Sequence, residues 1–224
     1  MWFLRPGIGF EDILMRIVAV MIIVFLVMPL HECAHGWIAV KLGDNTAKYS
    51  GRLTLNPLPH IDPLGALAIL LFGFGWARPV PVDPRNFKNP KSGMALTALA
   101  GPLSNLLAAL VGGLVLRVIF MFSASIPAVL MSWILIFFIN YMMINVGLAV
   151  FNLVPLPPLD GSKIIGAFIP DRILYRFAQY QNIIMMIVFV LLFVGVLSVP
   201  LGILQIAAYN GIIHITGLPS QMLL

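Results

Sequence analysis

The chain has little charge and almost no cysteine. Only 9 % of its 224 residues are charged, whereas soluble domains carry about a quarter. With 61 % hydrophobic residues and a mean hydropathy of +1.03, the composition excludes a soluble globular protein. It predicts an integral membrane protein with the lipid bilayer as its main partner. Cys33 is the only cysteine, so an intrachain disulfide is excluded.

The basic residues are gathered in predicted loops and form no stripe along one helix. The formal net charge is +5. This distribution indicates membrane topology, and we expect no nucleic-acid partner.

Four long apolar segments predict membrane-spanning helices: residues 11–41, 92–116, 128–153 and 183–199. Pro29 is expected to kink the first helix, because it cannot donate to the carbonyl of Phe25. Pro200 and Gly202 are expected to interrupt the fourth, leaving a further short helix at 201–215.

Two kinds of shorter segment complete the predicted fold. Residues 64–77 are apolar, but at 14 residues they are short for a span, so we expect them to re-enter the membrane. Residues 52–55 alternate like a strand, and 78–82 could form an edge strand despite their two prolines. The fold class is therefore a membrane all-α, polytopic helical bundle of about four to six transmembrane segments. A small β element lies at the cytoplasmic face. We expect one domain over 1–224, with a core at about 16–165 and C-terminal helices at about 183–217.

Charge predicts the orientation. If residues 64–77 re-enter, ten of the thirteen basic residues lie on one side of the membrane. These ten are Lys41, Lys48, Arg52, Arg78, Arg85, Lys88, Lys91, Lys163, Arg172 and Arg176. The positive-inside rule makes that side cytoplasmic.

The first predicted span contains His31-Glu32-Cys33-Ala34-His35. Ionisable side chains at membrane depth are costly and mark functional interiors. In the order HExxH, His31 and His35 lie one helical turn apart and can bind one zinc ion, with Glu32 as the general base for a water. Cys33 is expected to face elsewhere on the helix.

A catalytic zinc needs a third protein ligand. Asp160 is the best candidate, because it follows a proline-rich run directly after a predicted span, although it could instead cap a helix. His60 and Asp62 are rival ligands, for which a role in a turn is the alternative. His214 stands alone near the C-terminus.

Several motifs together resemble the site-2 protease family of intramembrane zinc metalloproteases, peptidase family M50. They are His31 to Gly36, Gly51 to Pro57, and Asn152 to Pro155 with Leu159-Asp160-Gly161; the segments Pro59 to Pro63, Arg78 to Val82 and Gly101 to Asn105 are similar to its compact members, which lack PDZ and CBS domains. The resemblance covers about residues 16–165. It implies one Zn²⁺ per chain bound by His31, His35 and Asp160, with Glu32 as acid and base. It also suggests that Asn152 helps to hold the substrate or the oxyanion.

We therefore expect an intramembrane zinc metalloendopeptidase whose partners are membrane proteins with a transmembrane helix. A prokaryotic plasma membrane, with the site toward the cytoplasm, fits this expectation. The alternative is a non-enzymatic zinc-binding membrane protein, either a carrier, a sensor or a pseudoprotease scaffold. Glu32 discriminates between them, because hydrolysis requires a glutamate that is not a ligand. The sequence does not predict the substrate or the oligomeric state.

Overall fold

A computed structural model describes residues 9–72 and 75–224. The elements are, in order, α1 (Phe10–Ile22), η2 (Ile23–Val27), α2 (Met28–Lys41), α3 (Thr46–Tyr49), α4 (Pro63–Phe72), η3 (Pro84–Asn86), α5 (Pro90–Met121), η4 (Ser123–Ser125), α6 (Ala128–Asn152), α7 (Asp160–Gly166), α8 (Asp171–Gln179), α9 (Gln181–Val194), α10 (Ser198–Thr216) and η5 (Ser220–Met222). The regular elements of the described residues are thus all helical, as the composition predicts.

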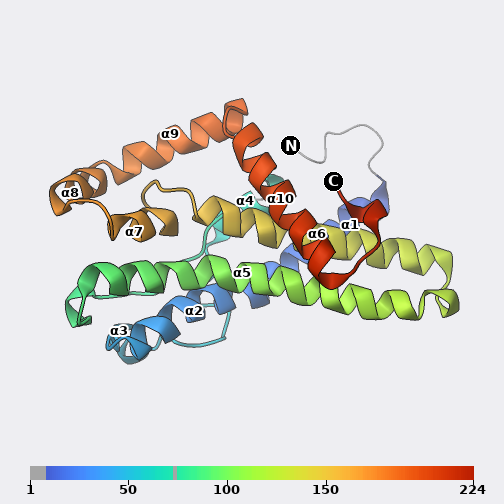
Figure 1. The fold of residues 1–224 in the computed structure, drawn as a ribbon, viewed down its shortest axis with the longest axis horizontal. Helices are drawn as coiled ribbons and strands as arrows, with labels where there is room; N and C mark the ends of the chain where they lie inside the picture. Colours follow the sequence, from blue (N-terminus) through green and yellow to red (C-terminus); the bar gives the residue numbers. More distant parts are fainter. Residues whose placement is uncertain (1–8, 73–74) are drawn as a thin grey trace.

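Four helices in the described ranges are long and apolar enough to cross a membrane: Phe10–Lys41, Pro90–Met121, Ala128–Asn152 and Ser198–Thr216. Residues 171–177 and 181–192 could together form a fifth span, bent by 64°. This confirms a polytopic helical bundle. Figure 1 shows α5 extending along the molecule, and α5 packs against α2, α6 and α7.

The first span contains a wide turn immediately before the HExxH residues. Residues Ile23–Val27 are π-helical, and the N–H of Met28 bonds to the carbonyl of Ile23. Pro29 follows at the start of α2. The kink at Pro29 stays a prediction. The irregularity in this span is the π-helical turn that ends two residues before Pro29, a feature that occurs most often at functional sites.

The C-terminal spans differ from the prediction for 183–199. α9 ends at Val194, where Gly195 adopts a left-handed conformation with φ of 89°. Pro200 does not interrupt a helix but lies in the first turn of α10. Proline is tolerated there because the first-turn N–H groups have no partner within the helix. The long helix is consequently α10, and α9 has only 14 residues.

The segment predicted to re-enter forms α4, which has 10 residues. It is about 15 Å long, half the thickness of the hydrocarbon core, so it cannot span. A Cβ on Gly65 would clash with the backbone of Trp76, which shows that α4 touches the chain segment after it. Residues 73–74, within the predicted segment, lie outside the described residues.

The predicted β element is not confirmed. Within the described ranges no strand is assigned to residues 52–55 or 78–82. Both are extended, but their groups bond elsewhere: the Arg52 N–H donates to the Ala47 carbonyl, and the Arg78 N–H donates to the His60 carbonyl at 2.8 Å. The guanidinium of Arg52 joins the two segments through the Arg78 carbonyl.

The apolar core lies in three clusters along the bundle. One joins the first span to α4 and α6, the second joins α5, α6 and α10, and the third joins the end of α6 to α9. The centre of α5 carries small residues, which lets α2 approach it closely. The HExxH residues lie at that contact.

Candidate metal centre

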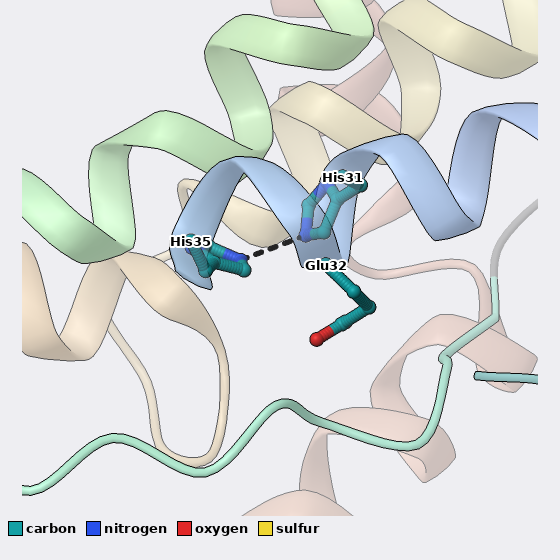
Figure 2. Close-up of side chains that lie close together, drawn as sticks. All are labelled: His31, Glu32 and His35. Carbon is teal, nitrogen blue, oxygen red and sulfur yellow. Dashed lines mark hydrogen bonds between the residues drawn. The ribbon is translucent and has the colours of Figure 1, made fainter. Parts of the chain in front are cut away.

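The two histidines of α2 lie one turn apart and face each other. His31 and His35 are 8 % exposed and Glu32 is 7 % exposed. Figure 2 shows the two rings on successive turns of α2, with their Nε2 atoms 3.1 Å apart. The spacing of four residues places both side chains on one face of the helix, as the motif predicts.

Asp160 reaches this pair from the other end of the sequence. It is the first residue of α7, and its Oδ2 lies 3.4 Å from His31 Nε2 and 3.2 Å from His35 Nε2. Its side chain caps no helix. Gly161 permits this placement, because a Cβ there would clash with the carbonyl of Leu153.

The three facing atoms have the separations that a zinc ion requires. Tetrahedral zinc bonded at about 2.0–2.1 Å places neighbouring nitrogen or oxygen ligands roughly 3.3 Å apart. The observed separations are 3.1, 3.2 and 3.4 Å. All three atoms are electron-pair donors when the histidines are neutral, so a cation would stabilise their approach. The residues therefore fit zinc.

Glu32 also lies close to the histidines, but it points elsewhere. Its carboxylate is within 4.8 Å of donor nitrogens of both rings, so it could itself join a metal site. However, its Oε2 accepts a hydrogen bond of 2.9 Å from the N–H of Val80. Figure 2 shows Glu32 directed toward the extended chain that passes below α2. Asp160 Oδ2 thus faces both Nε2 atoms, whereas Glu32 Oε2 is bound to the extended chain.

The extended chain is fixed to α2 by a buried carboxylate. Asp44 is fully buried and accepts from the N–H of Asp83 at 2.8 Å and from the side chain of Asn86 at 2.8 Å. Burial opposes ionisation of Asp44, but these bonds and those from Thr46 hold its pKa below the ordinary 3.8. Asp44 thus anchors the end of the extended chain, at Asp83, to the turn that follows α2.

A cavity of about 520 Å³ opens at the histidines. Its wall includes Glu32, Asp160 and Lys163, and it continues along the extended chain and the facing helices. The remaining lining is mostly apolar. Lys163 Nζ lies 3.2 Å from Asp160 Oδ1, the oxygen that faces away from the histidines. The cavity is large enough for a short stretch of peptide beside the three donor atoms.

Asn152 lines the cavity, but its amide is engaged in its own helix. The side-chain nitrogen donates to the carbonyl of Leu148 at 3.0 Å. The rival ligands are engaged elsewhere: His60 Nε2 bonds to the carbonyl of Thr54, and Asp62 accepts from the N–H groups of Leu64 and Gly65 at the start of α4. Both residues thus have contacts within turns, which was the alternative to metal binding for them.

Two other side chains lie apart from the donor atoms. Cys33 Sγ donates to the Thr54 carbonyl at 2.9 Å, on another face of α2. His214 is exposed on α10.

Sequence reasoning missed the contacts that α5 makes with the two rings. His35 Nδ1 lies 2.7 Å from the Thr97 carbonyl, and His31 Nδ1 lies 3.2 Å from Asn105 Oδ1. Val80 and Lys163 were also not singled out as site residues. The available signal was the polar Asn105 within a predicted span.

Comparison with known proteins gives one family. A sequence model of peptidase family M50 matches residues 117–195, a stretch that includes Asp160 but not the HExxH residues. No solved structure matches.

Curated relatives extend the similarity. The chain is 43 % identical over 173 residues to "Putative zinc metalloprotease YwhC" of Bacillus subtilis (strain 168), covering 77 % of each chain. It is 33 % identical over 138 residues to "Putative zinc metalloprotease Rip2" of Mycolicibacterium smegmatis, covering 59 % of this chain and 50 % of that one. It is 34 % identical over 139 residues to "Putative zinc metalloprotease MJ0611" of Methanocaldococcus jannaschii, covering 60 % and 62 %.

Proposed function

The chain belongs to peptidase family M50 and is a zinc metalloprotease, and we propose that it cleaves membrane proteins in or near their transmembrane segments. The observation that carries the proposal is the convergence of His31, His35 and Asp160 on one point beside a span. Their three donor atoms lie 3.1 to 3.4 Å apart. We propose that these residues hold one zinc ion per chain, within a single domain.

Glu32 acts as the acid and base in this proposal. Zinc, when bound, supplies Lewis acidity that lowers the pKa of a water toward about 7. Glu32 accepts a proton as that water's oxygen bonds to the scissile carbonyl carbon. It then delivers the proton to the amide nitrogen as the carbon–nitrogen bond breaks. The Val80 N–H keeps one oxygen of Glu32 in place, so the other oxygen is the one that exchanges the proton.

The decisive experiment compares the only two glutamates in the chain. Glu32→Gln should retain stoichiometric zinc but cleave a reporter containing a transmembrane helix at least about 100-fold more slowly, because a general base contributes that much or more. Glu11→Gln is the matched control, since Glu11 is exposed in the first turn of α1, and it should cleave normally. Normal cleavage by Glu32→Gln, or purified wild-type protein without zinc, would contradict the proposal.

We propose that the extended chain at 78–82 captures an unwound piece of substrate by strand addition. A peptide bond in an intact helix is shielded, so the substrate must unwind before cleavage. Among the described residues the Val82 N–H donates no hydrogen bond, and Val82 lines the cavity. Asn152, on the facing wall of the cavity, would help to hold the substrate if its amide leaves Leu148.

Proline at position 82 tests strand addition. Val82→Pro removes one N–H, whereas the control Val82→Ala keeps it. Val82→Pro should reduce turnover by about tenfold, the value of one lost hydrogen bond, with zinc content unchanged. Equal turnover of the two variants would count against capture by this segment.

We place the site toward the cytoplasm of a prokaryotic plasma membrane. The ten basic residues named above support this orientation. A reporter enzyme that works only in the cytoplasm should be active when it is inserted after α3, which contains Lys48. Activity there of a reporter that works only outside the cell would overturn the assignment.

A further inference from the structure

Helix α5 makes a polar contact with each histidine at Nδ1, the ring nitrogen that does not face Asp160. The Thr97 carbonyl receives a hydrogen bond from His35 Nδ1, and the Asn105 side chain lies against His31 Nδ1. Thr97 is 3 % exposed and Asn105 is 2 % exposed, so both contacts are shielded from water. Each ring is therefore held at both of its nitrogens.

The two helices match in their spacing. His31 and His35 are four residues apart on α2, while residues 97, 101 and 105 follow at steps of four along one face of α5. Gly101 stands between the two polar contacts, and a Cβ there would clash with the Nε2 atoms of both rings. Glycine at this position therefore allows α5 to lie against the rings closely enough for its acceptors to reach them.

The acceptors decide where each ring carries its hydrogen. A carbonyl oxygen can only accept, so the neutral ring of His35 carries its hydrogen on Nδ1 and presents a lone pair at Nε2. The amide oxygen of Asn105 imposes the same tautomer on His31. In that tautomer both Nε2 lone pairs face Asp160 Oδ2, where the zinc ion is proposed to bind.

We propose that Asn105 is a positioning residue that fixes His31 in the Nδ1–H tautomer and so prepares its Nε2 to bind zinc. The main-chain carbonyl of Thr97 does the same for His35. This inference rests on the zinc ligands proposed above, but it concerns a residue that contacts neither metal nor substrate. Removing such an outer partner of a metal-bound histidine weakens metal binding by about 10- to 100-fold.

The test measures the zinc dissociation constant of purified, detergent-solubilised variants by competition with a chromophoric chelator. Asn105→Leu, which keeps the approximate volume but has no acceptor, should bind zinc about 10- to 100-fold more weakly. Asn105→Asp, which keeps an acceptor, should restore affinity to within about threefold of wild type. Asn145→Leu is the matched control: Asn145 is also a fully buried asparagine of a span, but it donates to the carbonyl of Tyr141, and its affinity should not change.

A second measurement needs no variant. Nitrogen NMR of zinc-free wild-type protein labelled at histidine distinguishes the two neutral tautomers. His31 should carry its hydrogen on Nδ1, and in Asn105→Leu it should redistribute toward Nε2. A wild-type His31 with no hydrogen on Nδ1 would overturn the inference even if Asn105→Leu failed to fold.

The two proposals fail in different ways. If wild-type protein binds zinc and cleaves the reporter, but Asn105→Leu binds zinc equally well, only the role of Asn105 is overturned. If wild-type protein binds no zinc, the proposed function is overturned together with this inference.

Discussion

The metal centre is held mainly by polar contacts, whereas α9 and α10 pack mainly through apolar ones. At the centre, hydrogen bonds join α2 to α5 and to the extended chain, and Asp160 lies against both histidines. Against the end of α6, α9 rests on apolar contacts such as that of Val188, and none of the side chains of α8 that the structure describes is buried. Hydrogen bonds fix distance and direction, whereas apolar burial does neither. The region that must hold an ion in a set geometry is therefore the one built with polar contacts.

Replacing a glycine by alanine in each region should give the largest difference in zinc affinity between them. Gly101→Ala places a Cβ against both Nε2 atoms, so the rings must move, and we expect zinc affinity to fall by more than about 100-fold. Gly202→Ala in α10 meets nothing within 4 Å and should leave zinc affinity unchanged, with a gain in stability of about 0.5–1 kcal/mol. Chelator competition measures the zinc affinity, and thermal unfolding measures the stability. Tight zinc binding by Gly101→Ala would refute the close approach of α5.

Two aspartates give the next contrast. Asp160→Asn removes the charge from a proposed ligand and should weaken zinc binding by about 100-fold, as judged by metal retained after dialysis. Asp171→Asn breaks only an exposed ion pair with Lys91, whose atoms lie 2.9 Å apart, and should change stability by less than about 1 kcal/mol. Equal zinc retention by the two variants would exclude Asp160 as a ligand.

Asp44 offers a prediction that depends on pH. Asp44→Asn removes a charged acceptor from a buried cluster and should lower the free energy of unfolding by about 1–3 kcal/mol at pH 7. The folded-state pKa of Asp44 is depressed, so its contribution is present above pH 3.8 and is lost as the pH falls through the folded-state value. Thermal unfolding of the two proteins should therefore differ at pH 7 and converge in strong acid. A difference that persists unchanged there would show that the charge of Asp44 is not responsible.

Lys163 should give the smallest effect. Its ammonium contacts the outer oxygen of Asp160, but the side chain is 41 % exposed, so water screens the pair. Lys163→Met should weaken zinc binding by no more than about fivefold, the equivalent of about 1 kcal/mol. A loss as large as that of Asp160→Asn would mean that Lys163 orients the carboxylate.

The parts of the fold that were predicted correctly depend on the composition and length of single segments. Apolar length located the first three spans, because lipid requires a minimum of about 20 apolar residues in one helix. The same reasoning failed around Pro200, since proline either breaks a helix or begins one and composition alone does not say which. The β element at 52–55 and 78–82 was not confirmed. Alternation of apolar and polar residues shows that a segment can form a strand, but it does not show where a pairing strand lies.

The site residues also divide into those whose spacing is fixed within one helix and those that come from distant segments. His31, Glu32 and His35 were predicted because one helix fixes their spacing. The proline-rich run before Asp160 made it the best candidate but left a helix cap open, and only the resemblance to a family implied a ligand. No spacing rule relates Asp160 to His35, 125 positions earlier. Asn105 was missed because its partner is on another helix, and a sequence does not show which faces of two helices meet.

The π-helical turn at Ile23–Val27 sets the rotation of α2 about the helix axis. A π-helical turn holds one residue more than an α-helical turn, and each α-helical residue advances the chain by about 100° about the axis. Shortening the chain by one residue there, with an ordinary α-helical turn restored, would swivel both imidazoles by roughly that angle, away from α5 and from Asp160. This one irregular turn thus sets the rotation of the helix that carries the proposed zinc ligands.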